Sequence, residues 1–497
     1  MSNTGPETAT EPDRLEEILA AAQGAARAFG RMRPHARAAA LRAAADGLDA
    51  AGDELVPIAR RESHLPEPRL RGELARTTFQ LRLFADTVED GGFLRAAIDT
   101  PDAEWPPGPR PDLRRMMAAL GPVAVFGAGN FPFAFSVAGG DTASALAAGC
   151  PVVVKAHPGH PELSERTAGI VAAAVTGAGA PEGAFALVRG EQAGRAAVQD
   201  PRITAGAFTG SLAGGRALAD IAAARPEPIP FYAEMESLNP VFVTADAARR
   251  RRDDVIDGYV GSFTLGVGQF CTKPGILFAP AGAGFEEAVA ERVRGLAAAP
   301  LLNDRVAEGF DRGVERLSGH PAVHTAVAGT GAAGERSPSL FTTTADDLLR
   351  HGEDLLTECF GPASLLVAYD GEHQLAEAAR ALKGQLTATV QGTDADAGAD
   401  AGPVRELLDE LADRAGRVLW NGWPTGVAVS HAMQHGGPYP ATSAPLHTSV
   451  GTAAIDRFLR PVTYQSLPDA LLPEALQDAN PLGVPRSRDG APAVRDA

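Results

Sequence analysis

Short apolar runs alternate with amphipathic segments through the middle of the chain. We predict strands at 122–126, 151–155, 184–188, 203–208 and 229–233, and helices at 139–148, 162–175, 192–198 and 212–224. Parallel strands that are buried on both faces are continuously apolar, and each connection between them needs a crossover of about a dozen residues or more. This pattern predicts an α/β fold with a doubly wound parallel sheet.

A second alternation follows residue 240. It predicts strands at 241–243, 275–279, 363–369, 386–390 and 418–420 and a helix at 255–265, with further helices between the later strands. Residues 13–86 carry apolar side chains at three- and four-residue spacing, which predicts helices. Residues 300–343 show little strand pattern, so we expect them to pack around the outside. A helix at 449–458 and a strand at 459–465 complete the predicted elements.

Composition limits the function classes. The 497 residues are too many for one core, and 45 Lys and Arg against 62 Asp and Glu give a net charge of −17, which argues against nucleic acid and anionic membranes. Proline and asparagine interrupt the apolar stretch 118–140, so we expect no membrane span there. With three cysteines and no signal peptide, we expect a reducing, cytoplasmic location.

Two residues could carry covalent chemistry. Cys271 follows a glycine-rich segment where a predicted helix ends and a strand begins, a place that can expose a thiol in a cleft, although a lone cysteine is more often an inert core residue. Glu234 closes the last strand of the first unit, at the edge where open parallel sheets bind ligands, and could act as a general base. The alternative for Glu234 is a surface acid, with Glu236 as a rival.

An amide and a strand–helix junction add binding chemistry. Asn130 follows the first strand and could donate to a developing oxyanion, or it could simply form a turn. The segment 208–215 joins a strand to a helix, and Gly210 with Ser211 could bind a pyrophosphate at the helix N-terminus. Ser211 is equally well explained as a helix N-cap.

Three further residues are candidates for holding a ribose or a ring. Lys155 ends a predicted strand, while Glu358 and Phe360 precede a Gly-Pro turn; each also has a purely structural explanation. His431 and His435 have the spacing of helical metal ligands, but glycines follow at once and no HExxH motif is present, so we expect no metal site.

Taken together, the motifs resemble the aldehyde dehydrogenase superfamily. The order is Asn130-Phe-Pro, Lys155, Phe208-Thr-Gly-Ser, Glu234, Gly268-Gln-x-Cys271 and Glu358-x-Phe360-Gly-Pro. The segments 131–142, 154–158 and 435–443 narrow the resemblance to the branch of α-ketoglutarate semialdehyde (2,5-dioxovalerate) dehydrogenases and NADP-dependent fatty aldehyde dehydrogenases.

The resemblance implies a mechanism for each residue. Cys271 would attack the aldehyde, Asn130 would hold the oxyanion, and Glu234 would activate water to hydrolyse the thioester. NADP or NAD would be bound by a set of residues that the family motifs supply: Lys155, Phe208, Gly210, Ser211, Gly215, Glu358 and Phe360. Pro158 stands where NAD-preferring members often carry a glutamate, so we expect NADP to be tolerated and slightly favoured.

The resemblance also implies a domain plan and a homodimer or homotetramer. The expected ranges are a disordered tail (1–12), a cofactor domain (13–100 and 118–235), a small β oligomerisation element (101–117 and 446–470), a catalytic domain (236–445) and a C-terminal extension (471–497). Glu236-Ser237 replaces the usual Gly-Gly after the base, so Glu236 could perturb the pKa of Glu234 or impede the cofactor.

Three functions follow from these observations. The leading one is oxidation of 2,5-dioxovalerate to 2-oxoglutarate. A medium- or long-chain aliphatic aldehyde is the second, because Phe131, Phe133, Phe135 and Phe270 could line an apolar tunnel and residues 118–141 offer no cation for an anionic substrate. The third is a catalytically silent cofactor-binding scaffold, which the joint presence of Cys271, Glu234 and Asn130 argues against.

Overall fold

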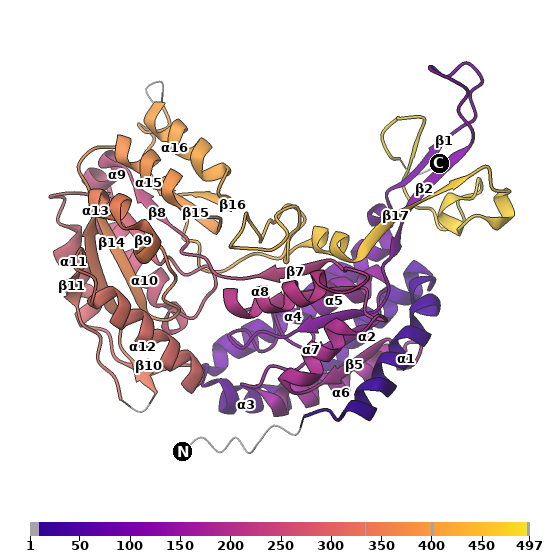
Figure 1. Cartoon of the computed structure of the whole chain (residues 1–497), viewed down its shortest axis with the longest axis horizontal. Helices are drawn as coiled ribbons and strands as arrows, with labels where there is room; N and C mark the ends of the chain where they lie inside the picture. Colours follow the sequence, from indigo (N-terminus) through magenta and orange to yellow (C-terminus); the bar gives the residue numbers. More distant parts are fainter. Residues whose placement is uncertain (1–8, 333, 399–401, 495–497) are drawn as a thin grey trace.

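The first lobe of the molecule is built on a parallel sheet (Figure 1). The computed structural model describes residues 9–332, 334–398 and 402–494, and in them this sheet has five strands in the order β5-β4-β3-β6-β7. Its elements are β3 (Val123–Phe126), α5 (Gly140–Ala148), β4 (Val152–Lys155), α6 (Pro161–Gly177), β5 (Phe185–Val188), α7 (Glu191–Gln199), β6 (Ala205–Thr209), α8 (Leu212–Ala223) and β7 (Phe231–Glu234). Every strand and helix predicted over this segment is confirmed, with its ends shifted by at most two residues.

Four helices precede this sheet, as predicted for residues 13–86. They are α1 (Pro12–Gly30), α2 (Pro34–Ala50), α3 (Gly52–Ser63) and α4 (Glu67–Asp90). Proline stands in the first turn of α1, α2 and α4, where its missing N–H costs no hydrogen bond. Alanines of α2 are buried in the core that α2 shares with the sheet, and their small side chains allow close helix packing.

The second lobe holds a larger sheet, with strand order β11-β13-β14-β9-β8-β15-β16 among the described residues. Its strands are β8 (Val241–Val243), β9 (Ile276–Pro280), β11 (His324–Val327), β13 (Ser339–Thr344), β14 (Ala363–Tyr369), β15 (Gln385–Gln391) and β16 (Ala415–Trp420). Its helices are α9 (Ala245–Arg250), α10 (Arg252–Thr264), α11 (Phe285–Arg294), α12 (Asp304–Ser318), α13 (Ala345–Arg350), α14 (Gly352–Leu355), α15 (His373–Ala381) and α16 (Gly402–Ala412). All neighbours are parallel except β11 and β13, so the predicted doubly wound α/β class is confirmed.

The expectation that residues 300–343 only pack around the outside is wrong. Strand β13 lies inside the second sheet between β11 and β14, and most of its residues are buried. Its sequence hides this position because four of its six residues are Ser or Thr. Backbone partners satisfy two of the buried hydroxyls: Ser339 Oγ accepts from Gly329 N (3.1 Å) and Thr343 Oγ1 donates to Ala322 O (2.7 Å).

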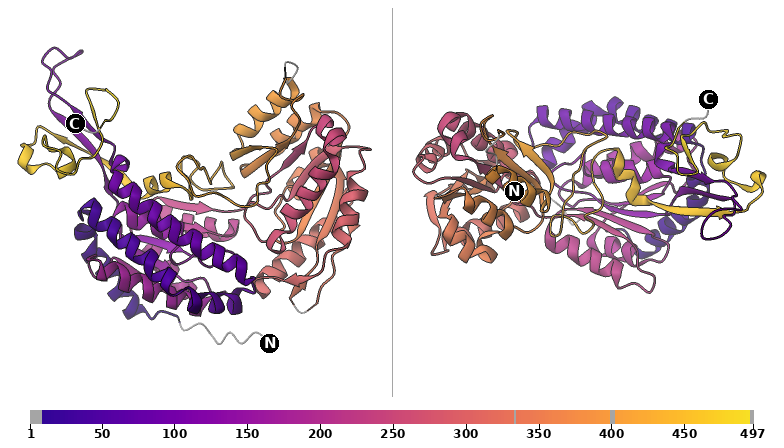
Figure 2. Two further views of the ribbon diagram at one scale, coloured as in Figure 1. Left: turned by 180° about the vertical axis from the view of Figure 1, so that it is seen from behind. Right: turned by 90° about the horizontal axis from the view of Figure 1, so that it is seen from above.

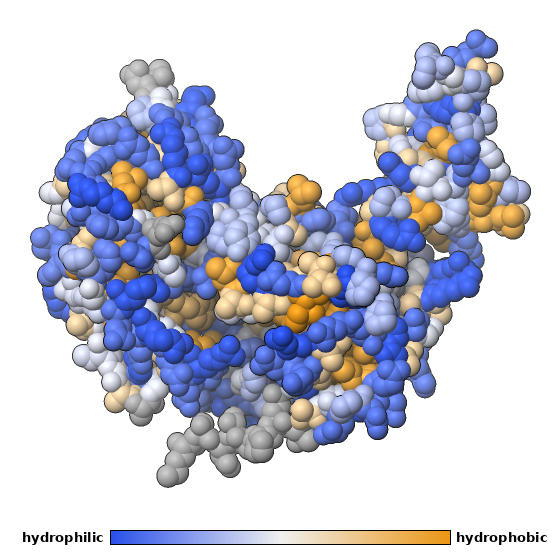
Figure 3. Space-filling model, viewed as in Figure 1, coloured by the Kyte–Doolittle hydropathy of each residue, from blue (hydrophilic) through white to orange (hydrophobic). Residues whose placement is uncertain are grey.

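A four-stranded sheet forms an arm that projects from the first lobe (Figure 2). It pairs β17 (Leu459–Gln465), β2 (Leu113–Ala119), β1 (Ala96–Asp99) and β18 (Arg486–Arg488) in that order. The predicted strand at 459–465 is confirmed, whereas the helix predicted at 449–458 is a 3₁₀ helix, η3 (Thr452–Phe458). Figure 3 shows a broad hollow between the arm and the second lobe.

The remaining elements are short. They are η1 (Gly92–Leu94), η2 (Leu265–Gly268), η4 (Asp469–Leu471), η5 (Glu474–Leu476) and the paired strands β10 (Ala299–Pro300) and β12 (Glu335–Arg336). Of the tail expected at 1–12, residues 1–8 lie outside the described residues, while Thr10 N donates to Arg189 O (3.0 Å). None of the described helices combines the length and the apolar character that a bilayer crossing requires.

Candidate active site

Cys271 lies in a tight loop between η2 and β9, where its side chain is half-buried. Gly266 and Gly268 both have positive φ angles, +57° and +66°. A Cβ on Gly268 would stand 2.3 Å from the carbonyl oxygen of Gly361, so only glycine allows this approach of two backbones. The loop therefore holds Cys271 next to the segment that carries Glu358 and Phe360.

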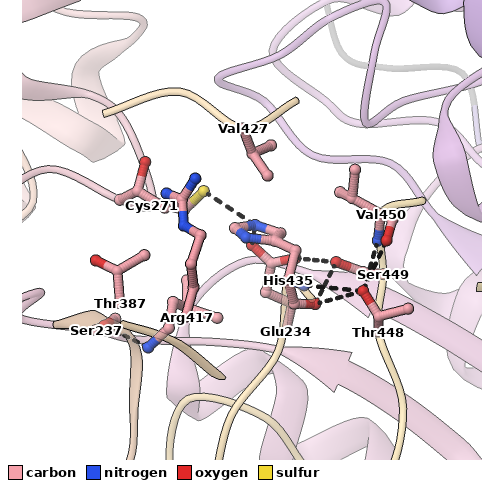
Figure 4. Close-up of polar contacts among 12 residues, drawn as sticks. Glu234, Ser237, Cys271, Thr387, Arg417, Val427, His435, Thr448, Ser449 and Val450 are labelled. Atoms are coloured by element: carbon pink, nitrogen blue, oxygen red, sulfur yellow. Dashed lines mark hydrogen bonds and ion pairs between the residues drawn. The ribbon is translucent and has the colours of Figure 1, made fainter. Parts of the chain in front are cut away.

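A histidine connects the thiol to the carboxylate of Glu234 (Figure 4). His435 Nε2 lies 3.6 Å from Cys271 Sγ and 2.9 Å from Glu234 Oε1, and the three ligand-type atoms are all within 4.8 Å of one another. From the sequence, His435 entered only as part of the segment 435–443 and in a rejected metal pair with His431, so its place between the thiol and Glu234 was not predicted. His431 points elsewhere, with Nδ1 3.2 Å from Thr452 Oγ1.

Glu234 is a buried carboxylate at the end of β7. Burial raises its pKa, but His435, the hydroxyl of Ser449 and the thiol of Cys271 together outweigh burial, and the pKa lies below the usual value. Ser449 Oγ donates to Oε2 at 2.6 Å. Glu234 is therefore ionised at neutral pH and able to accept a proton.

The thiol of Cys271 is held in its neutral form. Burial raises its pKa well above the usual value, and the nearby charge of Glu234 raises it further, while Arg76 opposes the shift. A thiolate is the reactive form of cysteine, so the thiol proton must be transferred when the nucleophile is used. His435 and Glu234 are the acceptors within reach.

Asn130, in the first lobe, contacts the loop between η2 and β9 that carries Cys271, which we call the thiol loop. Its Nδ2 donates to Gln269 O (3.1 Å), and its backbone carbonyl oxygen accepts from Arg69 Nη2 (2.8 Å). The side-chain amide of Asn130 is thus held against the thiol loop, at the carbonyl of the residue two positions before Cys271. The fold brings together all three residues that the sequence pointed to for chemistry.

The start of α8 is exposed to solvent, while neighbouring side chains pack closely against its glycines. A phosphate site requires both features. Ser211 Oγ accepts from Gly214 N (3.3 Å), so Ser211 is a helix N-cap, and Gly210 and Ser211 are exposed. A Cβ on Gly210 would stand 2.7 Å from the ring of Phe208, and one on Gly215 would stand 2.7 Å from the sulfur of Met235. These residues fit the pyrophosphate of a dinucleotide.

Two carboxylates lie beside this helix start. Glu236 accepts a hydrogen bond from the Leu212 N–H, and burial raises its pKa. Burial raises the pKa of Glu358 to about 8, with Glu236 adding to the shift and Lys273 opposing it. Because Glu236 accepts from the N-terminus of α8 and acts on Glu358, it lies on the phosphate side of the site.

Lys273 fixes the loop that carries Glu358 and the half-buried Phe360. Its buried Nζ donates to Cys359 O and to Ala363 O, both at 2.8 Å. This role of Lys273 was not predicted, because no local sequence pattern indicates that a lysine two residues after the thiol holds a distant loop in place. It connects the thiol loop to the segment expected to hold a ribose and the nicotinamide side.

The end of β4 is electropositive. Lys155 closes the strand, and burial together with the charges of His160, Lys155 and Arg305 lowers the pKa of His157 well below its usual value. Pro158 offers no carboxylate here. The residues present at this strand end suit an anionic group on a nucleotide ribose.

The fold and the site define a dinucleotide-dependent oxidoreductase, with a phosphate-binding helix start in one lobe and a thiol in the other. The chain matches the model of the aldehyde dehydrogenase family over residues 5–459, and it belongs to this family. The resemblance seen in the sequence is confirmed, and the protein is an NAD(P)-dependent aldehyde dehydrogenase.

Similar proteins cover almost the whole chain. An alpha-ketoglutaric semialdehyde dehydrogenase 2 of Azospirillum brasilense is 50% identical over 462 residues, which are 92% of this chain and 87% of that protein. An alpha-ketoglutaric semialdehyde dehydrogenase of Acinetobacter baylyi is 44% identical over 484 residues, 96% and 91% of the two chains. The fold is also that of an NAD-dependent aldehyde dehydrogenase from Sinorhizobium meliloti, with a TM-score of 0.76, 22% identity and coverage of 93% and 88%.

Proposed function

We propose that Cys271 is the nucleophile of this dehydrogenase. Its Sγ forms a bond with the aldehyde carbon, the thiol proton passes to the His435–Glu234 pair, and the carbonyl oxygen becomes an oxyanion held by Asn130 Nδ2 and the Cys271 N–H. Bound NAD(P)⁺ supplies the hydride acceptor. Once the pair has released the thiol proton to solvent, Glu234 removes a proton from the water that attacks the thioester. The thiolate leaves as the acid forms and takes up a proton again. The chain of contacts from Sγ through Nε2 to the carboxylate carries the proposal.

The substrate we propose is α-ketoglutaric semialdehyde, oxidised to 2-oxoglutarate. Its support is the identity of 50% and 44% to relatives named for this substrate, over nearly the full chain. An uncharged aliphatic aldehyde is the second candidate. The edge-to-face rings of Phe131, Phe135 and Phe270, with centroids 5.3 Å and 5.1 Å apart, favour it because they offer an apolar wall near Cys271.

For the cofactor, we propose a preference for NADP over NAD. Lys155 and Arg305 give the end of β4 a positive potential, and Pro158 supplies no competing carboxylate. We expect the ratio of kcat/KM for NADP to that for NAD to exceed one, and Arg305→Gln to lower it roughly tenfold. Steady-state kinetics with both cofactors measure it, with Arg312→Gln on the exposed face of α12 as the control. A wild-type ratio below one, or no change in Arg305→Gln, contradicts the preference.

For the assembly, we propose a cytoplasmic homodimer or homotetramer. The arm projects from the first lobe with β17 at one edge of its sheet, and β16 ends the sheet of the second lobe (Figure 1). Exposed strand edges of this kind are usually covered by another chain. The arm sheet also contains Ala96–Asp99 and Arg486–Arg488, so we propose an oligomerisation element larger than the sequence indicated.

The nucleophile is tested by Cys271→Ala. We expect this variant to lose dehydrogenase activity by at least about 10⁴-fold while it still binds the cofactor, because only the attacking atom is removed. Cys150→Ala is the matched control, since Cys150 is fully buried in the first lobe and should leave turnover unchanged. Turnover that survives in Cys271→Ala would refute the proposal.

The base is tested by Glu234→Gln. We expect hydrolysis of the thioester to slow, so that an acyl-enzyme accumulates and adds the acyl mass to the protein in intact mass spectrometry after a single turnover. Glu236→Gln is the control and should not accumulate it, because Glu236 faces α8. Accumulation in Glu236→Gln alone would move the base to that residue.

A further inference from the structure

Two arginines from opposite lobes reach one loop beside the thiol. Arg417 of β16 donates through Nη2 to Pro424 O (2.7 Å) and Gly426 O (3.1 Å). Arg76 of α4 approaches Val427 O through Nη2 at 3.5 Å. Gly426 N donates to Thr272 Oγ1 (3.2 Å), so this loop, residues 424–427, is fastened directly to the neighbour of Cys271. Figure 4 shows the guanidinium of Arg417 next to Cys271, with Val427 on the neighbouring loop.

Neither arginine forms an ion pair within the described part of the chain, although the carboxylates of Glu73 and Glu234 act on Arg76 from farther away. Neither Arg76 nor Arg417 has a carboxylate partner within 4 Å there, and the buried Nε of Arg417 has no hydrogen-bond partner. Carbonyl oxygens accept from them but carry no net charge. Burial lowers the pKa of both groups, and a thiolate at Cys271 would oppose that shift. A partly desolvated cation without a counter-ion is costly unless a ligand supplies the anion.

A third arginine nearby is already used in the structure. Arg69 donates to Asn130 O (2.8 Å), and its guanidinium lies over the rings of Phe131 and Phe270, with its Cζ 5.0 Å and 4.6 Å from their centroids. It positions the amide and the thiol loop. In the described part of the chain the hydrogen bonds of Arg417 and Arg76 go to the backbone of loop 424–427, and Arg76 also lies over the ring of Phe135, with its Cζ 5.2 Å from the centroid. Their other N–H groups remain for a ligand.

We propose that Arg417 and Arg76 bind the carboxylate of an ω-oxo acid whose aldehyde carbon is attacked by Cys271. This inference rests on the proposed function and adds the groups that select the substrate. A five-carbon oxo acid spans about 5 Å from aldehyde carbon to carboxylate carbon when extended, so one end can meet the thiol while the other meets guanidinium groups beside it. Guanidinium–carboxylate hydrogen bonds are charge-assisted and geometrically specific. Both arginines lie outside residues 118–141, the segment in which the sequence offers no cation.

The test compares two five-carbon aldehydes, 2,5-dioxovalerate and pentanal. In Arg417→Gln and in Arg76→Gln we expect kcat/KM for the oxo acid to fall at least about 30-fold, mainly through KM, and kcat/KM for pentanal to change less than about threefold. Arg417→Lys should recover part of the loss. Arg414→Gln is the matched control, because Arg414 pairs with Glu410 at 2.8 Å on the same lobe. An equal loss for both aldehydes, or no loss for the oxo acid, overturns the proposal.

Binding of 2-oxoglutarate, the product, tests the two arginines independently of the proposal that Cys271 is the nucleophile. 2-Oxoglutarate should raise the Tm of the wild type and of Cys271→Ala, and it should fail to do so in Arg417→Gln, whose own Tm and cofactor affinity report that it is folded. If Cys271→Ala stays active, the nucleophile is wrong, and the thermal shift still decides on the arginines. If Cys271→Ala is inactive but Arg417→Gln binds 2-oxoglutarate normally, the nucleophile stands and the anchor fails.

Discussion

The environment of Cys271 favours a protonated thiol in the free enzyme. Burial and the carboxylate of Glu234 both raise the pKa of the thiol, and a neutral thiol resists alkylation and oxidation. The same carboxylate is kept ionised by His435 and Ser449, so it can receive protons as soon as a reaction requires it. The site therefore holds an ionised carboxylate next to a thiol that its proton protects from alkylation and oxidation.

This arrangement predicts how the thiol of the free enzyme titrates. Glu234→Gln removes the negative charge that raises the pKa of Cys271, so more thiolate exists at a given pH. We expect the rate of alkylation of Cys271 by iodoacetamide at pH 8 to rise about tenfold, which corresponds to a pKa lower by about one unit. The rate is followed by mass spectrometry from pH 6 to pH 10. A rate that falls in Glu234→Gln would mean that Glu234 activates the thiol before substrate arrives.

Residues of the site differ in how far the sequence predicts them. Cys271, Glu234 and Asn130 stand at ends of predicted elements, where a local pattern already indicates exposure to a cleft. His435, Arg76 and Arg417 stand on loops, helices and edge strands without any such pattern. Their importance depends on which segments meet, and spacing along the chain carries no information about that.

At the level of elements, the thiol loop and the loop 358–362 form one unit. Lys273 binds carbonyl oxygens of the second loop, and Asn239 Nδ2 donates to Cys271 O (2.9 Å) and Lys273 O (3.0 Å). Asn239 lies in the segment that leads from Glu234 into the second lobe. The thiol, the base and the cofactor loop are thus connected through backbone carbonyls rather than through flexible side chains alone.

The backbone contact at Gly268 is the point at which this unit is most sensitive. Gly268→Ala combines a positive φ with a Cβ that would overlap Gly361 O, so we expect a loss of about 1–3 kcal/mol in the free energy of unfolding and a fall in kcat of at least about tenfold. Gly261→Ala in α10 is the control, because its Cβ meets nothing within 4 Å, and it should be neutral or stabilising. Denaturant unfolding and steady-state rates measure both; equal stability of the two variants would contradict the argument.

For the molecule as a whole, the exposed sheet edge β16 predicts where copies of the chain would associate in the proposed oligomer. Val418 of β16 is 39% exposed, and a lysine there would place an unpaired charge in any interface that covers this edge. We expect Val418→Lys to weaken self-association at least about tenfold, measured by light scattering after size exclusion. Leu349→Lys is the control, since Leu349 is 37% exposed on α13, outside both β16 and the oligomerisation element. A mass that is unchanged in Val418→Lys places the interface elsewhere.

The sequence by itself determined the local elements and the class of chemistry. Continuous apolar runs specify buried parallel strands, since such strands must be apolar on both faces. Ordered motifs near the ends of these elements pointed to a thiol, an acid, an amide and a glycine-containing turn as candidates for the site. It failed at β13, because hydroxyl groups that bond to the backbone allow a polar segment to be buried.

Only the tertiary structure decided which distant segments share the site. His435 lies 201 positions after Glu234 and yet bonds to it, and Arg76 and Arg417 meet one loop from two lobes. Hydrophobic burial and backbone hydrogen bonds fix the packing of the lobes, and this packing sets the distances between charges. Electrostatic effects depend on those distances and on burial, so the protonation state of the thiol and the location of the cations follow from the fold.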